Sequence, residues 1–300
     1  DDMEVSPVLS DNIRTASAIL GQPGEQAGPE IEVSQDRLLV ANRPRLMRAV
    51  RAPGVSPATL KEFGFNVTAV EWPLDLEGIE QAVTAGLWLM PQLPLNFVSD
   101  SSPQNQLSQL LGELPFRESV LCWDVGTNLG AEESKVVTAM VRDLRARSPR
   151  RPIAADVSGS FHKYSRELEM VATHRWPIGT AMGMREYRDW LTYRRRLARP
   201  GTYFYTWIQA SDDPREAGHV PNEMGPEPDQ IRLLTYSALA SGCRGLAFWA
   251  DRSLGQPGAG RERLLQLGLL NLELQLLEPY FASAGSTSTD RTGVPSTKFV

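Results

Sequence analysis

From residue 46 onward, the sequence alternates short apolar runs with longer segments of helical periodicity. This alternation is typical of βαβ units, whose strands form a parallel sheet. The apolar runs predict strands at 46–50, 66–72, 87–94, 120–126, 152–158, 177–184, 202–210 and 245–251. The segments that follow them predict helices at 56–64, 76–86, 104–114, 131–148, 164–174, 185–198, 228–242 and 262–281.

Strand–helix units in strict alternation predict a closed (β/α)8 TIM barrel, a fold of roughly 250 residues. The helix ends agree with this assignment: Ser56 and Pro57 suit the start of the first helix, and Gly64 suits its end. An open, doubly wound sheet is the alternative. It would usually carry a G-x-G-x-x-G turn after its first strand, and "RAPGVSPA" does not have that pattern.

The regions outside the barrel have a different composition. Residues 1–30 are weakly patterned and predict an extended leader, whereas 31–45 alternate apolar and polar residues and predict a short β-hairpin that feeds the barrel. The barrel itself is expected over 46–285, followed by a Ser/Thr/Gly-rich, linker-like tail at 286–300. The first residues do not resemble a signal peptide, and no apolar run reaches the roughly 20 residues that a membrane span needs. Because the first residues do not look like a natural start and the last ones look like a linker, we interpret the chain as part of a longer polypeptide.

Net charge and the spacing of possible metal ligands argue against several classes of function. The formal net charge of -5 argues against a surface for nucleic acid or anionic membrane. The two cysteines make no disulfide framework, and the three histidines lack the H-E-x-x-H spacing of a zinc hydrolase. The sequence therefore predicts neither a metal site nor a cofactor.

In a TIM barrel the active site lies at the C-terminal ends of the strands. The residues expected there are Arg51, Glu71, Trp72, Gln92, Asp124, Asn128, Asp156, Glu186, Trp207, Gln209, Trp249 and Asp251. Tryptophans and amides are frequent in this set. Indole rings stack on sugar rings and amides bond to hydroxyls, so the set predicts a neutral oligosaccharide or polysaccharide as ligand.

Several segments resemble clan A glycoside hydrolases. "LLVANRPRLMRAVRAPG" is similar to their entry into the barrel, and "LKEFGFNVTAVEW" to their second strand. "WDVGTNL" resembles the strand-four pattern W-x-x-G-N-E-P, "TYFYTWIQ" the seventh strand and "GLAFWAD" the eighth. The whole chain also resembles bacterial barrel proteins that share an "ALASGCRGLAFW" block. The resemblance covers about residues 38–281 and implies a carbohydrate-recognising barrel, exported or at the cell surface.

This resemblance places amides where the family has its two catalytic glutamates. Asn128 occupies the acid/base position of strand four, and Gln209 is nearest to the nucleophile position of strand seven. An amide neither protonates a leaving oxygen at useful rates nor forms a glycosyl ester. Two hypotheses follow: a hydrolase with displaced carboxylates, or a non-catalytic sugar-binding pseudo-hydrolase domain of a larger exported protein.

The first hypothesis needs two facing carboxylates, about 5–5.5 Å apart in retaining enzymes and about 6.5–9.5 Å apart in inverting ones. The candidates are Asp124, Asp251 and Glu71, and the expected sugar contacts are Asn128, Gln209, Trp72, Trp207 and Trp249. Each carboxylate also has a structural alternative. Asp124 can be a buried hydrogen-bonding group, Asp251 a rim ion pair or the N-cap of a turn, and Glu71 a tie for its own loop. The Gly-rich segment at 254–263 suits either a rim loop or a phosphate site.

Overall fold

The computed structural model of the protein describes residues 29–71, 74–95, 111, 116–211 and 225–283. Almost all of the predicted leader, all of the predicted tail and most of the predicted helix at 104–114 lie outside these residues. The division of the chain into leader, barrel and tail therefore stays a prediction.

Parallel strands form the central sheet. They are β4 (Met47–Arg51), β5 (Val67–Val70), β6 (Trp88–Pro91), β7 (Trp123–Asp124), β8 (Ile153–Asp156), β9 (Met170–His174), β10 (Tyr203–Gln209) and β11 (Gly245–Trp249). Their order is β6-β5-β4-β11-β10-β9-β8-β7, so the first barrel strand pairs with the last. The two outer strands meet through the bridges Leu89–Val120 and Gln92–Asp124. The predicted (β/α)8 barrel is confirmed.

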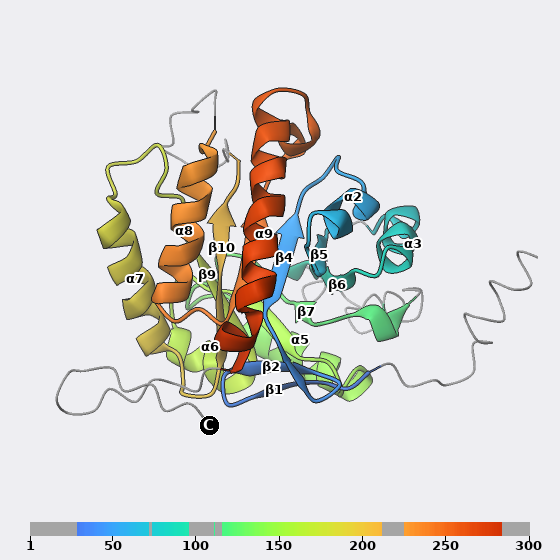
Figure 1. Ribbon diagram of the computed structural model, residues 1–300. Coiled ribbons are helices and arrows are strands. Elements are labelled where there is room, and N and C mark those ends of the chain that lie inside the picture. Colours follow the sequence, from blue (N-terminus) through green and yellow to red (C-terminus); the bar gives the residue numbers. More distant parts are fainter. Residues whose placement is uncertain (1–28, 72–73, 96–110, 112–115, 212–224, 284–300) are drawn as a thin grey trace, which may run out of the picture.

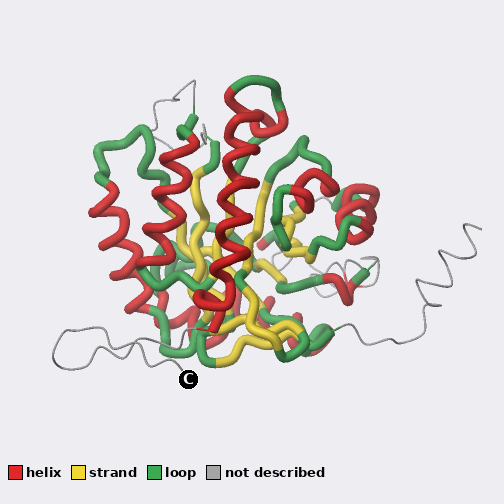
Figure 2. The backbone as a smooth tube through the Cα atoms, in the orientation of Figure 1, coloured by secondary structure: helices red, strands yellow, loops and turns green. Residues whose placement is uncertain are grey.

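Helices surround the strands (Figures 1 and 2). They are α2 (Pro57–Glu62), α3 (Leu76–Thr84), α5 (Ser134–Arg147), α6 (Phe161–Glu167), α7 (Met184–Leu197), α8 (Pro228–Ala240) and α9 (Ala259–Ser283), with short 3-10 turns η2 (Arg117–Ser119) and η3 (Arg252–Gly255). Ser56 caps α2, because its hydroxyl accepts the Thr59 N–H at 3.2 Å. Gly260 lets the first turn of α9 approach η3, since a Cβ there would lie 1.9 Å from the Ser253 carbonyl oxygen.

Side chains alternate along the strands between two buried clusters. Met47, Ala49, Tyr203 and Tyr205 belong to the cluster inside the barrel. The intervening residues, including Val50 and Phe204, pack against the helices. This is the period-two alternation of a strand buried on both faces. Trp123 belongs to the outer cluster and its Nε1 donates to Ser148 Oγ at 3.1 Å, so it is a core residue rather than a rim residue.

A small antiparallel sheet precedes the barrel. The hairpin predicted at 31–45 consists of β1 (Ile31–Ser34) and β2 (Arg37–Val40), and a third strand, β3 (Arg43–Arg45), pairs with β2. Ile31 and Leu38 are buried in the same cluster as the inward-facing barrel residues. The small sheet therefore covers the N-terminal end of the barrel, at the bottom of Figure 1.

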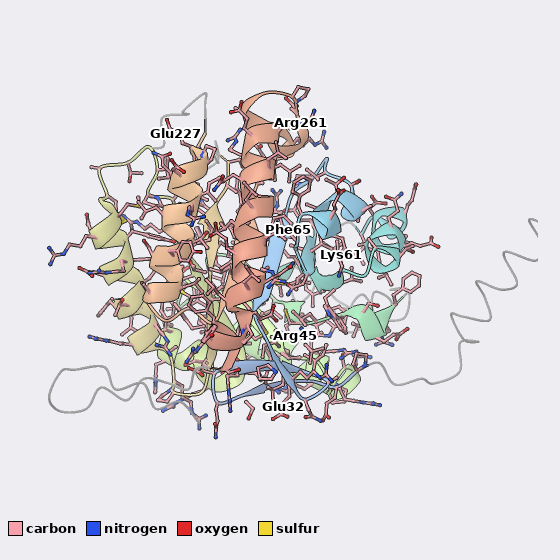
Figure 3. The ribbon with its side chains drawn as sticks, viewed as in Figure 1. Glu32, Arg45, Lys61, Phe65, Glu227 and Arg261 are labelled. Atoms are coloured by element: carbon pink, nitrogen blue, oxygen red, sulfur yellow. The ribbon has the colours of Figure 1, made fainter. Side chains whose placement is uncertain are left out.

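The opposite end of the barrel carries the C-termini of the strands. Glu227 and Arg261, at the starts of α8 and α9, lie at the end of the molecule away from Glu32 and Arg45 (Figure 3). The Glu227 N–H donates to Gln230 Oε1 at 2.8 Å in a capping box that begins α8. Helices that start here return antiparallel to the strands, so the candidate site is expected at this end.

The sixth barrel strand differs from its prediction. The sequence predicted a helix over 164–174 and a strand over 177–184, but α6 ends at Glu167, and β9 is Met170–His174. The predicted strand is wrong: 177–183 forms a loop that leads into α7. Pro177 lacks an N–H for strand pairing, whereas Val171 and Thr173 are β-branched and favour a strand. The correction moves His174 to the C-terminal end of a strand and Trp176 into the loop after it.

Candidate functional site

A pocket of about 240 Å³ opens where the strands end. Its lining, defined here as the central pocket, consists of Arg51, Glu71, Gln92, Thr127, His174, Trp176, Trp207 and Trp249. Arg51, His174 and Trp249 are the last residues of β4, β9 and β11. The fold therefore brings together polar and aromatic side chains from strands that are distant in sequence.

Aromatic rings form one wall of the central pocket. The ring of Trp176 lies 5.8 Å from that of Trp249 and 5.0 Å from that of His174, measured between centroids. Trp207 is buried beside them with 3% exposure. The Arg51 guanidinium also lies over the ring of Trp249, 5.0 Å from the indole centroid. Such a wall suits the apolar face of a sugar ring.

Arg51 holds the carboxylate of Glu71. Its Nε and one terminal nitrogen donate to the two Glu71 oxygens in a bidentate pair, and its other terminal nitrogen donates to the Ala250 carbonyl at 3.0 Å. Glu71 is half exposed, so the pair contributes little to stability. Among the lining residues that the structure describes, Glu71 is the one carboxylate.

Asp124 is fully buried next to the central pocket residue Gln92. Gln92 Nε2 donates to its Oδ2 at 3.2 Å, and the Gly126 N–H donates to its Oδ1 at 3.0 Å. Burial, together with the nearby charge of Asp156, raises the pKa of Asp124 to about 7. The two hydrogen bonds favour the charged form and reduce this rise. Asp124 therefore exchanges a proton near neutral pH.

Asp156, at the end of β8, orients two groups of the rim. Its Oδ2 accepts the Asn128 N–H at 3.0 Å and lies 2.6 Å from His174 Nδ1. A carboxylate at this distance favours the His174 tautomer with its proton on Nδ1. Asn128 itself has φ 58°, a left-handed conformation that asparagine tolerates better than glutamate. The local backbone thus favours the amide residue at this position.

A second pocket, of about 270 Å³, adjoins the first. Its lining, defined here as the side pocket, consists of Asn128, Val157, Ser158, Thr173, His174, Arg175, Trp176, Thr180, Trp190 and Arg194. The two pockets share His174 and Trp176. A ligand that extends past these two rings therefore passes from one pocket into the other.

Two of the predicted site residues bond to backbone instead of lining either pocket. Gln209 is 1% exposed; its Oε1 accepts the Ile178 N–H at 3.1 Å and its Nε2 donates to the Ile178 carbonyl at 3.5 Å. Asp251 is the N-cap of η3, where its Oδ1 accepts the Ser253 N–H at 2.8 Å. Gln209 thus holds the loop after β9, and Asp251 shapes a turn.

The remaining predicted residues have varied positions. Glu71, Trp207 and Trp249 meet at the central pocket, and Asn128 lines the side pocket. Trp72 lies outside the described residues. His174 and Trp176, which line both pockets, were missed because the helix predicted over 164–174 hid the strand that presents them. The β-branched alternation in "MVATH" was the sequence signal for that strand.

Over the ranges that the structure describes, no three His, Cys, Asp or Glu side chains gather in a way that suits a metal ion. Within the same ranges, no helix combines the length and apolar character that a membrane crossing requires.

Solved structures share the fold. A β-galacturonidase of family GH2 from Eisenbergiella tayi, solved with galacturonate bound, matches with a TM-score of 0.63 at 13% identity, over 82% of this chain and 54% of its own. A family 5 mannosidase from Rhizomucor miehei matches with a TM-score of 0.56 at 9% identity, over 86% of this chain and 100% of its own. The chain has the barrel fold of the clan A glycoside hydrolases. This confirms the resemblance predicted from the sequence.

The likeness concerns the fold alone. The glycoside-hydrolase-like barrel spans about half the length of the galacturonidase. A truncated 3-deoxy-D-arabino-heptulosonate 7-phosphate synthase from Thermotoga maritima also matches, with a TM-score of 0.50 at 10% identity, over 86% of this chain and 95% of its own. No family model matches the sequence, and no curated protein matches it either. Function must therefore be argued from the site.

Proposed function

We propose that this glycoside-hydrolase-like barrel binds an oligosaccharide or polysaccharide in the central pocket, without cleaving it at the family's two catalytic positions. The observation that carries this proposal is that Trp176, Trp207 and Trp249 line the same pocket as the polar groups of Gln92 and Thr127. Indole faces suit the neutral, apolar face of a sugar ring, and the amide and hydroxyl groups suit its hydroxyls. The galacturonidase and the mannosidase that share the fold act on carbohydrates, which supports a carbohydrate ligand.

The carboxylates argue against hydrolysis. Cleavage needs an acid and a second carboxylate on either side of the bond. In the described lining of the central pocket, two nitrogens of Arg51 hold the carboxylate of Glu71. The sequence resemblance aligns amides, Asn128 and Gln209, with the two glutamates of the family. Asp251 accepts a hydrogen bond within its own turn. A binding domain, as part of a larger exported protein, fits this arrangement better than an enzyme does.

One observation favours the alternative, hydrolysis by displaced carboxylates. Asp124 has a pKa of about 7, the range of a general acid that works near neutral pH. In this alternative Asp124 would donate the proton and Glu71 would be the second carboxylate. Asp124 is 0% exposed, so a substrate would reach it only after Gln92 moves.

Trp176→Ala should weaken glycan binding about tenfold, because it removes a stacking surface from the central pocket. A glycan array selects an oligosaccharide, and titration calorimetry with that oligosaccharide measures the affinity. Trp88→Ala is the matched control: Trp88 begins β6, at the end of the strand away from the pocket. The proposal fails if the wild-type protein binds no glycan, or if both variants lose affinity equally.

A release assay on the same oligosaccharide separates the two functions. Product release by the wild-type protein that disappears in Asp124→Asn would establish the hydrolytic alternative. We expect no release from either protein.

A further inference from the structure

The side pocket differs from the central pocket in charge. Its described lining contains Arg175 and Arg194 and no carboxylate. In the central pocket, by contrast, Glu71 neutralises Arg51. The lining of the side pocket therefore carries more positive charge than that of the central pocket, in a chain whose formal net charge is -5. The nearest carboxylate behind it, that of Asp156, is bonded to His174 and to the Asn128 N–H.

Arg194 is held in place by groups that carry no negative charge. One terminal nitrogen donates to the Ser158 carbonyl at 3.1 Å, and the guanidinium lies 5.3 Å from the ring centroids of both Phe161 and Trp190. Its Nε is buried and makes no hydrogen bond with the described residues. These contacts restrict the side chain, and none of them neutralises its charge.

Two other arginines on α7 form ion pairs that neutralise their charge. Arg188 pairs with Asp189 at 3.0 Å, and Arg195 pairs with Asp36 at 3.0 Å. Across the described part of the chain, no carboxylate lies within ion-pair distance of Arg194 or of Arg175, which is exposed. A fixed, unneutralised guanidinium is a good receptor for a planar or tetrahedral oxyanion.

The side-chain amide of Asn128 adds a neutral donor to the same lining. The hydroxyls of Ser158 and Thr180 also belong to it, but they already donate to backbone carbonyls. His174 and Trp176 form the boundary with the central pocket. A sugar stacked on Trp176 thus has a neighbouring space in which an anionic group would meet two arginines.

We propose that the side pocket binds an anionic substituent of the carbohydrate, either the carboxylate of a uronic acid or a sulfate ester. This inference rests on the proposed function and names the ligand class: an acidic saccharide whose ring occupies the central pocket. Arg194 is the principal contact, and Arg175 adds charge at the rim.

The test uses three sugars that share a ring: glucose, glucuronate and glucose 6-sulfate. Chemical-shift titrations of the whole chain should show that the wild-type protein binds at least one acidic sugar about tenfold more tightly than glucose, since charge-assisted hydrogen bonds contribute about 1.4 kcal/mol or more. The two acidic sugars distinguish a carboxylate receptor from a sulfate receptor. Added salt should reduce this preference, because it screens the arginines.

Arg194→Gln should remove the preference and leave glucose affinity within about twofold of the wild type. Arg196→Gln is the matched control, because it removes the same charge from an exposed position on the same helix. Arg194 also packs between two rings, so Arg175→Gln provides a second variant at an exposed position, and we expect a partial loss of the preference. Thermal unfolding of each variant verifies that it is folded.

The outcomes separate this inference from the proposed function. Equal wild-type affinity for all three sugars would overturn the anionic subsite and leave carbohydrate binding intact. The same follows if Arg196→Gln reduces the preference as much as Arg194→Gln. Binding of none of the three sugars, and of no glycan on the array, would overturn both.

Discussion

Asp124→Asn should be more stable than the wild-type protein at pH 8 and should lose this advantage at pH 4. Burial raises the pKa of Asp124 in the folded protein to about 7, whereas an unfolded chain has a value of about 3.9. Between these two pH values the folded state holds a proton that the unfolded state releases. Wild-type stability therefore falls as the pH rises from about 4 to about 7, and the loss persists above pH 7.

The size of this effect is at most about 4 kcal/mol, the free energy that corresponds to the difference between the two pKa values. Asparagine avoids it because the amide stays neutral. The side-chain oxygen of the introduced asparagine can accept the Gly126 N–H. Its nitrogen can donate to Gln92 Oε1 once the Gln92 amide has flipped. Urea unfolding of both proteins at pH 4, 6 and 8 measures the difference.

Asp251→Asn is the control for Asp124→Asn. Asparagine is as good an N-cap as aspartate, so the bond to the Ser253 N–H is kept and little change is expected at any of the three pH values. If the difference in stability between Asp124→Asn and the wild-type protein is the same at pH 4 and pH 8, folding does not raise the pKa of Asp124.

Gln209→Glu should destabilise the protein by about 3 kcal/mol at pH 8 and should not restore hydrolysis, because it places a charge in a site that is 1% exposed. The carboxylate would keep the bond from the Ile178 N–H but would face the Ile178 carbonyl, which Gln209 Nε2 now donates to. The family's glutamate therefore does not fit the present contacts of this side chain. The loop that carries Trp176 should loosen as a result.

The pH dependence of this loss of stability shows whether the introduced charge causes it. At pH 4 the introduced carboxyl can take up a proton and donate to the Ile178 carbonyl, so most of the loss should disappear. Gln209→Met breaks both bonds without adding a charge, and its loss of stability should be the same at pH 4 and pH 8. A stable double variant, Gln209→Glu with Asn128→Glu, that releases sugar from an oligosaccharide would show that these positions form an active centre after all.

The sequence by itself determined the barrel. Strand and helix periodicities are local, so the runs that became β4, β10 and β11 and the helices α5, α7 and α8 were recognisable without knowledge of their partners. The order of the units then implied that the strand ends meet at one face. Asp251 was also within reach of sequence reasoning, because its cap partner, Ser253, is two residues away.

The sixth strand was beyond this local reasoning. The run that contains Met170–His174 follows a helix directly, and a short apolar run does not by itself distinguish the end of a helix from a buried strand. Pairing with Tyr203–Trp207 decides the matter, and those residues lie about thirty positions later. With the strand misplaced, His174 and Trp176 could not be assigned to the site.

The character of the site was decided by the tertiary structure alone. The sequence predicted that Gln209, Asp124 and Asn128 lie at strand ends. Only the packing of the folded chain shows that Gln209 bonds to the backbone of Ile178, and that Asp124 is buried and bonded to Gln92. The pairing of Asp156 with His174 and the neutral contacts of Arg194 likewise depend on which distant groups come near. Burial and neighbouring charge set the pKa and the hydrogen bonds of a side chain, and neither is encoded in the spacing of residues along a strand.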